Sequence, residues 1–195
     1  SGKTTTLYSC LQELNKPEVN IVTCEDPVEY QIAGLNQVQI NAFVGLTFAA
    51  ALREVLRQSP DIILVGETRD SETAEIAVKA ALTGHLVLST LHTNDAAGAI
   101  TRLIDMGIEP SLLASSLILA QAQRLVSKLC SCKKPLTELP LKLLQTYNVD
   151  PAMFEGCTIY GPGAGCPKCH NTGYSGRLAF MEVLPMTREL RQDII

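Results

Sequence analysis

Four residues at the start of this chain have the types and order that bind phosphate. Ser1-Gly2-Lys3-Thr4 matches the last four positions of the pattern G-x-x-x-x-G-K-[ST], so the sequence is expected to begin partway through a phosphate loop. In that pattern the glycine admits a phosphate close to the backbone, the lysine neutralises the β- and γ-phosphates, and the threonine hydroxyl binds Mg²⁺. The triplet Gly-Lys-Thr is common, so by itself it also fits a surface loop.

A carboxylate follows an apolar run further along the chain. Ile62–Val65 is continuous and apolar, which is typical of a parallel strand buried on both faces, and Gly66 and Glu67 come directly after it. Phosphate-loop enzymes usually end this strand in an Asp that holds Mg²⁺, and here Gly66 occupies that place. Glu67 is suited to orient or deprotonate an attacking water, or to hold Mg²⁺ through water. A solvated glutamate at a strand end is the alternative interpretation.

Three carboxylates stand within five residues after another apolar run, Asn20–Cys24. The segment Glu-Asp-Pro-Val-Glu-Tyr at residues 25–30 carries Glu25, Asp26 and Glu29, and its proline discourages a helix. Neighbouring carboxylates repel one another unless a cation lies near, which favours a site for Mg²⁺ and nucleotide. A polar turn is the alternative.

A histidine ends the third apolar run, Leu86–Leu91. His92 is expected at the same edge of the sheet as Glu67, because the carboxyl ends of parallel strands meet at one edge. An imidazole at this edge can donate a hydrogen bond to a γ-phosphate. His85 precedes the run, so we expect it at the opposite edge with a structural role.

Two close pairs of cysteines indicate a metal site. Cys130 and Cys132 have the spacing C-x-C, and Cys166 and Cys169 have the spacing C-x-x-C. Four thiolates suit tetrahedral Zn²⁺, and metal binding would contribute folding free energy to a region with little apolar core. The C-x-C spacing is tighter than usual, which leaves Cys157 as a substitute ligand.

Other interpretations of these cysteines remain open. They are also explained as small buried residues. The segment 166–170 reads C-x-x-C-H, the pattern of covalent haem attachment. Haem would leave the second cysteine pair unexplained, and it is attached outside the cytoplasm, where a phosphate-loop protein would find no nucleotide, so we prefer zinc.

Predicted helices alternate with the three apolar runs. This order predicts an α/β fold with a parallel-rich central sheet flanked by helices. Ser71 is expected to cap one of the helices. Pro110 is expected to open a long helix to about Lys128, buried over its apolar stretch Ser111–Ala122. The other helices are predicted at Thr4–Leu14, Thr47–Gln58, Ser71–Leu82 and Asp95–Met106.

Composition divides the chain into three parts. Residues 1–128 hold the alternating pattern and form the predicted nucleotide-binding core. Residues 129–176 hold most of the Cys, Pro and Gly and form a predicted metal-binding subdomain. Residues 177–195 are expected to form a strand and the start of a C-terminal helical segment.

Bulk composition excludes several classes of protein. Hydrophobic residues make up 46% of the chain, which excludes disorder, and the net charge of −4 argues against a nucleic-acid binder, including a zinc-ribbon module for nucleic acid. No run of about 18 apolar residues is present to span a membrane. Seven cysteines, an odd number, favour a metal site in a reducing compartment over a disulfide framework.

Taken together, the segments resemble a known family. Ser-Gly-Lys-Thr-Thr-Thr at 1–6, Glu-Asp-Pro-Val-Glu-Tyr at 25–30, Pro-Asp-Ile-Ile-Leu-Val-Gly-Glu-Thr-Arg-Asp at 60–70 and Ser-Thr-Leu-His-Thr-Asn-Asp at 89–95 are similar to the Walker A, Asp, Walker B and His boxes of the secretion ATPase superfamily. The boxes stand in that family's order, and the similarity covers nearly the whole chain.

The resemblance implies a function and its partners. It implies a RecA-like P-loop ATPase core that uses ATP, Mg²⁺ and Zn²⁺ and works as a homo-hexamer. Such a motor powers assembly of pilin or pseudopilin subunits in type IV pilus biogenesis or type II secretion. It would be cytoplasmic and peripheral to the inner membrane, bound to a membrane platform. The four-cysteine element favours an assembly or secretion motor over a retraction motor.

The resemblance also implies roles for individual residues. The catalytic glutamate maps to Glu67, the Asp-box glutamate to Glu29 and the His-box histidine to His92. A chain that lacks the first half of the phosphate loop can instead be an inactive structural or nucleotide-binding module, which is the competing hypothesis. The implied nucleotide contacts are Ser1, Gly2, Lys3, Thr4 and Thr5, with Arg53, Arg57, Arg69 and Arg102 as candidate phosphate-binding arginines.

Overall fold

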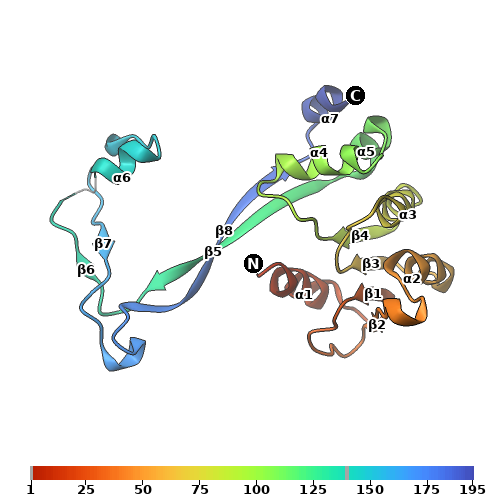
Figure 1. Ribbon diagram of the computed structural model, residues 1–195, viewed down its shortest axis with the longest axis horizontal. Coiled ribbons are helices and arrows are strands. Elements are labelled where there is room, and N and C mark those ends of the chain that lie inside the picture. The colour runs from red at the N-terminus through yellow and green to blue at the C-terminus, as the bar shows by residue number, and fades with distance from the viewer. Residues whose placement is uncertain (1, 139–140) are drawn as a thin grey trace. The chain divides into compact units, whose positions relative to one another are not determined.

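The structure is a computed structural model that describes residues 2–138 and 141–195 (Figure 1). The chain folds into two compact units. Unit 1 comprises Ser1–Arg124 together with Met181–Ile195, and unit 2 comprises Leu125–Phe180. Unit 2 is therefore an insertion into the sequence of unit 1.

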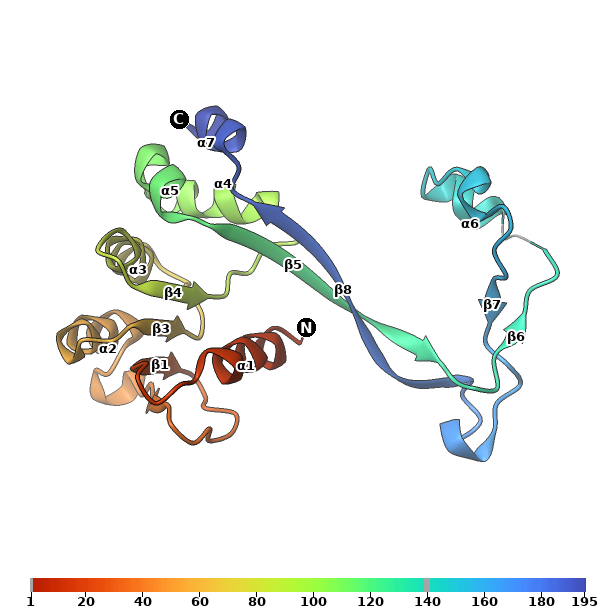
Figure 2. The same cartoon turned by 180° about the vertical axis from the view of Figure 1, so that it is seen from behind.

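Unit 1 is built on a sheet of four parallel strands. The strands lie in the order β2 (Asn36–Gln39), β1 (Ile21–Glu25), β3 (Ile62–Val65) and β4 (Leu86–Ser89). Figure 2 shows β1, β3 and β4 running in the same direction. The predicted α/β fold with a parallel central sheet is confirmed. The polar strand β2 was not predicted, because its sequence has no apolar run.

Helices cover both faces of this sheet. Alternate residues of a strand face opposite sides, so Val22 and Cys24 of β1 pack against α2 (Phe48–Val55) and α3 (Ser71–Leu82). Ile21 and Leu64 face the other side and pack against Tyr8 and Leu11 of α1 (Lys3–Leu14). Every residue of β1 and β3 is buried, as expected of a sheet covered on both faces.

A separate apolar cluster joins the later helices of unit 1. It brings together α4 (Ala97–Asp105), α5 (Pro110–Ser116) and α7 (Arg188–Ile194) against α3. Arg191 of α7 donates hydrogen bonds to the backbone carbonyls of Ala114 and Leu117, the second at 3.0 Å. The end of the chain thus packs against α5, which precedes the insertion.

The predicted long helix from Pro110 to about Lys128 is wrong. Helix α5 ends at Ser116, Leu117 is extended, and β5 (Leu119–Leu129) pairs with β8 (Tyr174–Pro185). The stretch Ser111–Ala122 is also not a buried helix, since Ile118 and Leu119 are exposed. Pairing with a strand far along the sequence overrides the local helical pattern.

Unit 2 contains little regular structure within its described residues. It holds α6 (Leu141–Thr146) and the antiparallel pair β6 (Lys134–Pro135) and β7 (Tyr160–Gly161).

No helix among the described residues is both long and apolar enough to cross a bilayer. Short 3₁₀ helices lie at Ala42–Val44, Leu56–Gln58, Pro151–Phe154 and Pro167–Cys169.

The sequence led us to expect Ser71 as the N-cap of α3. The structure shows that Asp70 caps this helix instead. The backbone of Asp70 is extended, and its Oδ1 accepts a hydrogen bond from the Thr73 N–H at 2.8 Å. Its Oδ2 accepts a second hydrogen bond, from the Thr73 hydroxyl at 3.0 Å. A carboxylate also interacts favourably with the positive end of the helix dipole, so Asp70 is the better cap.

We expect Asp70→Ala to lower the free energy of unfolding by about 1 kcal/mol, because it removes the acceptor for the first turn of α3. Ser71→Ala is the matched control and should change the free energy by less than about 0.5 kcal/mol. Urea unfolding of both variants measures the difference. Equal effects of the two substitutions would contradict the assignment of the cap.

Candidate active site and metal centre

A cavity of about 190 Å³ lies in unit 1 where the carboxyl ends of β1 and β3 meet the first turn of α1. This is the edge at which open α/β sheets bind ligands. The parallel register places the end of β1 beside the end of β3, since Cys24 lies opposite Val65. The cavity is lined by the candidates Lys3, Thr4, Glu29, Glu67 and His92, together with Leu7, Tyr8, Glu25, Asp26, Pro27, Leu64, Gly66 and Thr90.

The start of α1 carries the candidate phosphate-binding residues. Gly2 precedes the helix with φ of 77°, a left-handed conformation that favours glycine. The Nζ atom of Lys3 donates a hydrogen bond to the backbone carbonyl of Leu91 at 3.1 Å. Thr4 is exposed and lines the cavity, whereas Thr5 is exposed and does not line it. Ser1 lies outside the described residues.

Gly66 lets the ends of β1 and β3 come together. Its N–H donates to the Cys24 carbonyl at 2.8 Å, and its own carbonyl accepts from the Thr90 hydroxyl at 2.8 Å. A Cβ atom at residue 66 would lie only 3.1 Å from the Cys24 oxygen and 3.3 Å from Cα of Glu25. The position therefore disfavours any side chain, and the acidic group of this strand end is the next residue, Glu67.

Glu67 lies between two basic side chains. Its Oε2 is 3.3 Å from Nε2 of His92, and its Oε1 is 2.6 Å from Nη2 of Arg69, a contact that lacks the alignment of a hydrogen bond. The Glu67 side chain is only 12% exposed, so both neighbours act on a carboxylate that has lost most of its water. Oε1 of this carboxylate is buried and has no hydrogen-bond partner among the described residues.

Glu25, which the sequence grouped with Asp26 and Glu29 but gave no role of its own, lines the cavity as a buried carboxylate. Glu25 is 3% exposed, and its Oε1 accepts hydrogen bonds from the Thr23 hydroxyl at 2.6 Å and from Nε2 of Gln37 at 3.1 Å. Its Oε2 accepts from the hydroxyl of Tyr8, which burial and the nearby carboxylate keep protonated by raising the pKa of Tyr8 to about 12. The only sequence signal for Tyr8 is its place one turn after Thr4 on an amphipathic helix.

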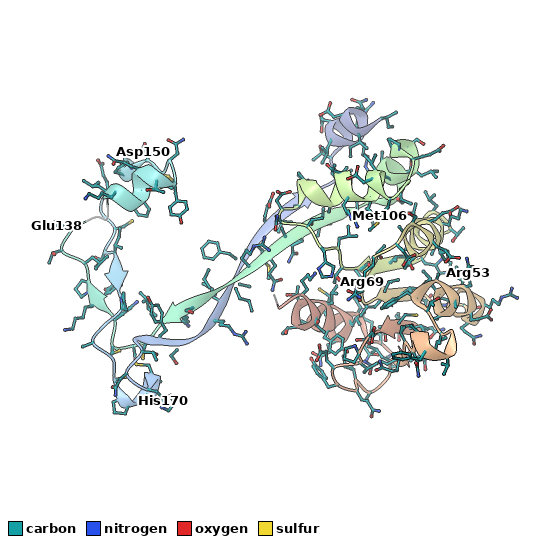
Figure 3. The ribbon with its side chains drawn as sticks, viewed as in Figure 1. Arg53, Arg69, Met106, Glu138, Asp150 and His170 are labelled. Atoms are coloured by element: carbon teal, nitrogen blue, oxygen red, sulfur yellow. The ribbon has the colours of Figure 1, made fainter. Side chains whose placement is uncertain are left out.

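The four candidate arginines occupy different environments. Only Arg69 contacts a residue that lines the cavity. Arg53 pairs with Glu72, Arg57 lies 3.9 Å from Glu54, and Arg102 is exposed on α4, so none of these three lines the cavity. Figure 3 shows Arg53 on the outer side of α2 and Arg69 beside the ends of the strands.

In unit 2 the two cysteine pairs come together. Their four sulfur atoms lie within 4.8 Å of one another, with Cys130–Cys166 and Cys166–Cys169 separations of 3.8 Å and a Cys132–Cys169 separation of 3.9 Å. Metal–sulfur bonds of about 2.3 Å in a tetrahedron place the sulfurs about 3.8 Å apart. The cluster therefore fits a metal ion with tetrahedral coordination by four protein ligands. The C-x-C spacing does not prevent this, and Cys157 is exposed outside the cluster.

Backbone amides of unit 2 donate to the sulfur of Cys169. The N–H groups of Cys166 and Gly173 lie 3.2 and 3.3 Å from it. Burial alone would raise the pKa of Cys169, but these amides and the neighbouring thiols lower it to about 6. A thiolate is the form that binds metal, so the amides prepare the site. A cluster of all four sulfurs also favours a metal ion over haem, which would use only Cys166 and Cys169.

The sequence of the chain is similar to those of known secretion and pilus-assembly proteins. A family described as "Type II/IV secretion system protein" matches residues 1–195. The chain is 56% identical to the type IV pilus assembly ATPase PilB of Myxococcus xanthus and 52% identical to the type II secretion system ATPase E of Vibrio cholerae, over its whole length in both cases. It covers 34% and 38% of those two proteins, and so spans about a third of their length.

Solved structures show the same fold. The pilus retraction motor PilT with bound ADP is 32% identical, with a TM-score of 0.62 over 82% of this chain and 55% of that one. The ATPase DotB of Legionella pneumophila is 25% identical, with a TM-score of 0.65 over 98% of this chain and 44% of that one. The candidate residues thus stand on a fold shared with secretion ATPases.

We expect Gly66→Ala to lower the free energy of unfolding by about 1–3 kcal/mol, because the new methyl group overpacks the contact between β1 and β3. Urea unfolding followed by circular dichroism measures this change. An unchanged midpoint would contradict the close approach of these two strand ends.

Proposed function

Since this chain belongs to the Type II/IV secretion system protein family, we propose that it is the catalytic core of an ATPase. The whole protein powers assembly of pilin or pseudopilin subunits, in type IV pilus biogenesis or type II secretion. One observation carries the proposal. Five residues predicted from separate segments of the sequence line the same cavity, namely Lys3, Thr4, Glu29, Glu67 and His92. Because the chain spans about a third of its relatives' length, the activity is assigned to the whole protein.

In this proposal the start of α1 binds the phosphates of ATP. The first turn of the helix has free N–H groups and the positive end of the helix dipole, both of which attract an anion. Lys3 has an ammonium group beside the cavity and exchanges its hydrogen bond with the Leu91 carbonyl for one with a phosphate oxygen. The hydroxyl of Thr4 and the carboxylate of Glu29 are the oxygen donors suited to Mg²⁺, which when bound would neutralise phosphate charge.

Glu67 orients the attacking water and accepts its proton. Its carboxylate is little exposed and lines the cavity, so it is poised to act as a general base. His92, 3.3 Å from Glu67, donates to the γ-phosphate and links its presence to the position of the carboxylate. Arg69 is the candidate for stabilising the charge that develops on the phosphate, because it alone of the four arginines reaches the cavity residues.

The remaining arginines fit a role between subunits. Arg53, Arg57 and Arg102 lie away from the cavity of their own chain, so they could contact nucleotide only in a neighbouring subunit. We propose a homo-hexamer, as the family resemblance implies. The motor would be cytoplasmic, at the inner membrane, where it meets a membrane platform and the proteins of the pilus or secretion machinery.

We further propose that the cysteine cluster of unit 2 binds Zn²⁺. The sulfur separations of 3.8 to 3.9 Å fit four thiolate ligands around one tetrahedral ion. Unit 2 has few fully buried apolar side chains among its described residues, so bound metal would supply folding free energy that a core supplies elsewhere.

We expect Glu67→Gln in the intact protein to lower kcat for ATP hydrolysis at least about 100-fold, because an amide cannot accept the proton of water. ATP binding should stay within about threefold of the unsubstituted protein. Glu75→Gln, an exposed residue paired with Lys79, is the matched control and should hydrolyse ATP normally. Normal ATP hydrolysis by Glu67→Gln would show that Glu67 is not the general base.

A nucleotide titration separates this proposal from the competing one, in which the chain is only a binding module. ATP binding and ATP hydrolysis are measured for the 195-residue chain and for the intact protein in parallel. Binding and hydrolysis by both support a catalytic core in this chain. Hydrolysis by the intact protein alone would favour the module.

We expect one zinc ion per chain by elemental analysis, and Cys169→Ser should reduce this content by more than half and lower the melting temperature of unit 2. Cys157→Ser is the matched control, since Cys157 is exposed outside the cluster, and it should retain its zinc. Loss of zinc in the control alone would show that the wrong cysteine has been assigned.

A further inference from the structure

We propose that Tyr8 is a positioning residue that fixes Glu29 relative to the phosphate-binding start of α1. The proposal deepens the ATPase function proposed above and rests on it. Tyr8 does not touch the reacting atoms in this scheme. It acts through the segment 25–30, which it joins to the helix that carries Lys3 and Thr4.

The hydroxyl of Tyr8 makes two hydrogen bonds in opposite senses. It donates to Oε2 of Glu25, and it accepts from the backbone N–H of Glu29 at 3.3 Å. A phenol has one proton to donate and lone pairs to accept, so both bonds are satisfied at once. One oxygen atom therefore connects α1 to both ends of the acidic segment.

The Tyr8 and Glu25 side chains, at one end of this connection, are buried and held by several contacts. Tyr8 is 1% exposed and Glu25 is 3% exposed, and the same carboxylate accepts from Thr23 and Gln37. The ring of Tyr8 also meets that of Tyr30 edge to face, with centroids 4.7 Å apart. Because the pKa of Tyr8 is raised to about 12, the hydroxyl keeps its proton at any working pH.

Glu29, in contrast, is exposed in a segment without regular structure. Two neighbouring hydrogen bonds also hold the segment, from the Val28 N–H to Oε1 of Gln39 at 2.8 Å and from Nε2 of Gln37 to the Tyr30 carbonyl at 3.2 Å. Tyr8 stands one helical turn after Thr4, and Thr4 and Glu29 line the same cavity. Holding the backbone of Glu29 to Tyr8 thus sets the distance between these two oxygen donors.

The first test needs no catalytic activity. Tyr8→Phe removes only the hydroxyl, and amide hydrogen exchange of residues 26–30 is measured in the intact protein. We expect the Glu29 amide to exchange about fivefold faster or more, the effect of losing one hydrogen bond of about 1 kcal/mol. An unchanged rate overturns the proposal.

Two controls separate positioning from general destabilisation. Thr23→Val removes another donor to the Glu25 carboxylate at a fully buried position but has no hydrogen bond to Glu29. Tyr30→Phe changes the partner ring without removing the Tyr8 hydroxyl. Both should leave exchange at Glu29 within about twofold of the unsubstituted protein, under conditions in which each variant is folded. Equal acceleration in Thr23→Val and Tyr8→Phe would overturn the specific role.

The second test asks whether Tyr8 acts through Glu29. Tyr8→Phe should lower kcat for ATP hydrolysis about tenfold and leave KM within about twofold. In a Glu29→Gln background the same substitution should cause no further loss, because the group it positions has already been changed. A full additional tenfold loss in that background overturns the proposal. Absence of hydrolysis in the unsubstituted intact protein would refute the ATPase function, and the exchange measurement would still decide the role of Tyr8.

Discussion

The parallel register of β1 and β3 is the constraint on which the catalytic edge depends. Parallel pairing aligns the ends of these strands at one edge of the sheet, so side chains distant in sequence become neighbours there. Such a sheet must be buried on both faces, which α1 on one side and α2 and α3 on the other accomplish. Gly66 lets the strand ends close together, and Glu67 then projects beside them.

The two units solve the problem of stability in different ways. Unit 1 buries apolar side chains between helices and sheet, and it tolerates the buried carboxylate of Glu25 because three donors satisfy it. Unit 2 has few buried apolar side chains among its described residues and gathers four sulfurs instead. Small elements of this kind commonly rely on metal where a core is lacking.

Features encoded in short segments were predictable, and features that depend on distant pairing were not. The apolar run Ile62–Val65 identified a buried strand and located Glu67 at its end, because burial on both faces leaves a local signature. The residues after Ser116 have no comparable signature, so their pairing with β8 could not be foreseen. The hydrogen bonds of Tyr8 join α1 to a loop through a single oxygen atom, which no periodicity reveals.

The insertion of unit 2 has a consequence for the order in which this chain folds during translation. The four described strands of the unit 1 sheet have been synthesised once Ser89 has left the ribosome, but α7 packs against α5 only after residues 125–180 have been made. Until then the apolar surface that later receives Met186, Leu190 and Ile194 stays open to solvent on the nascent chain. The packing of unit 1 is therefore completed only after the whole of unit 2 has been synthesised.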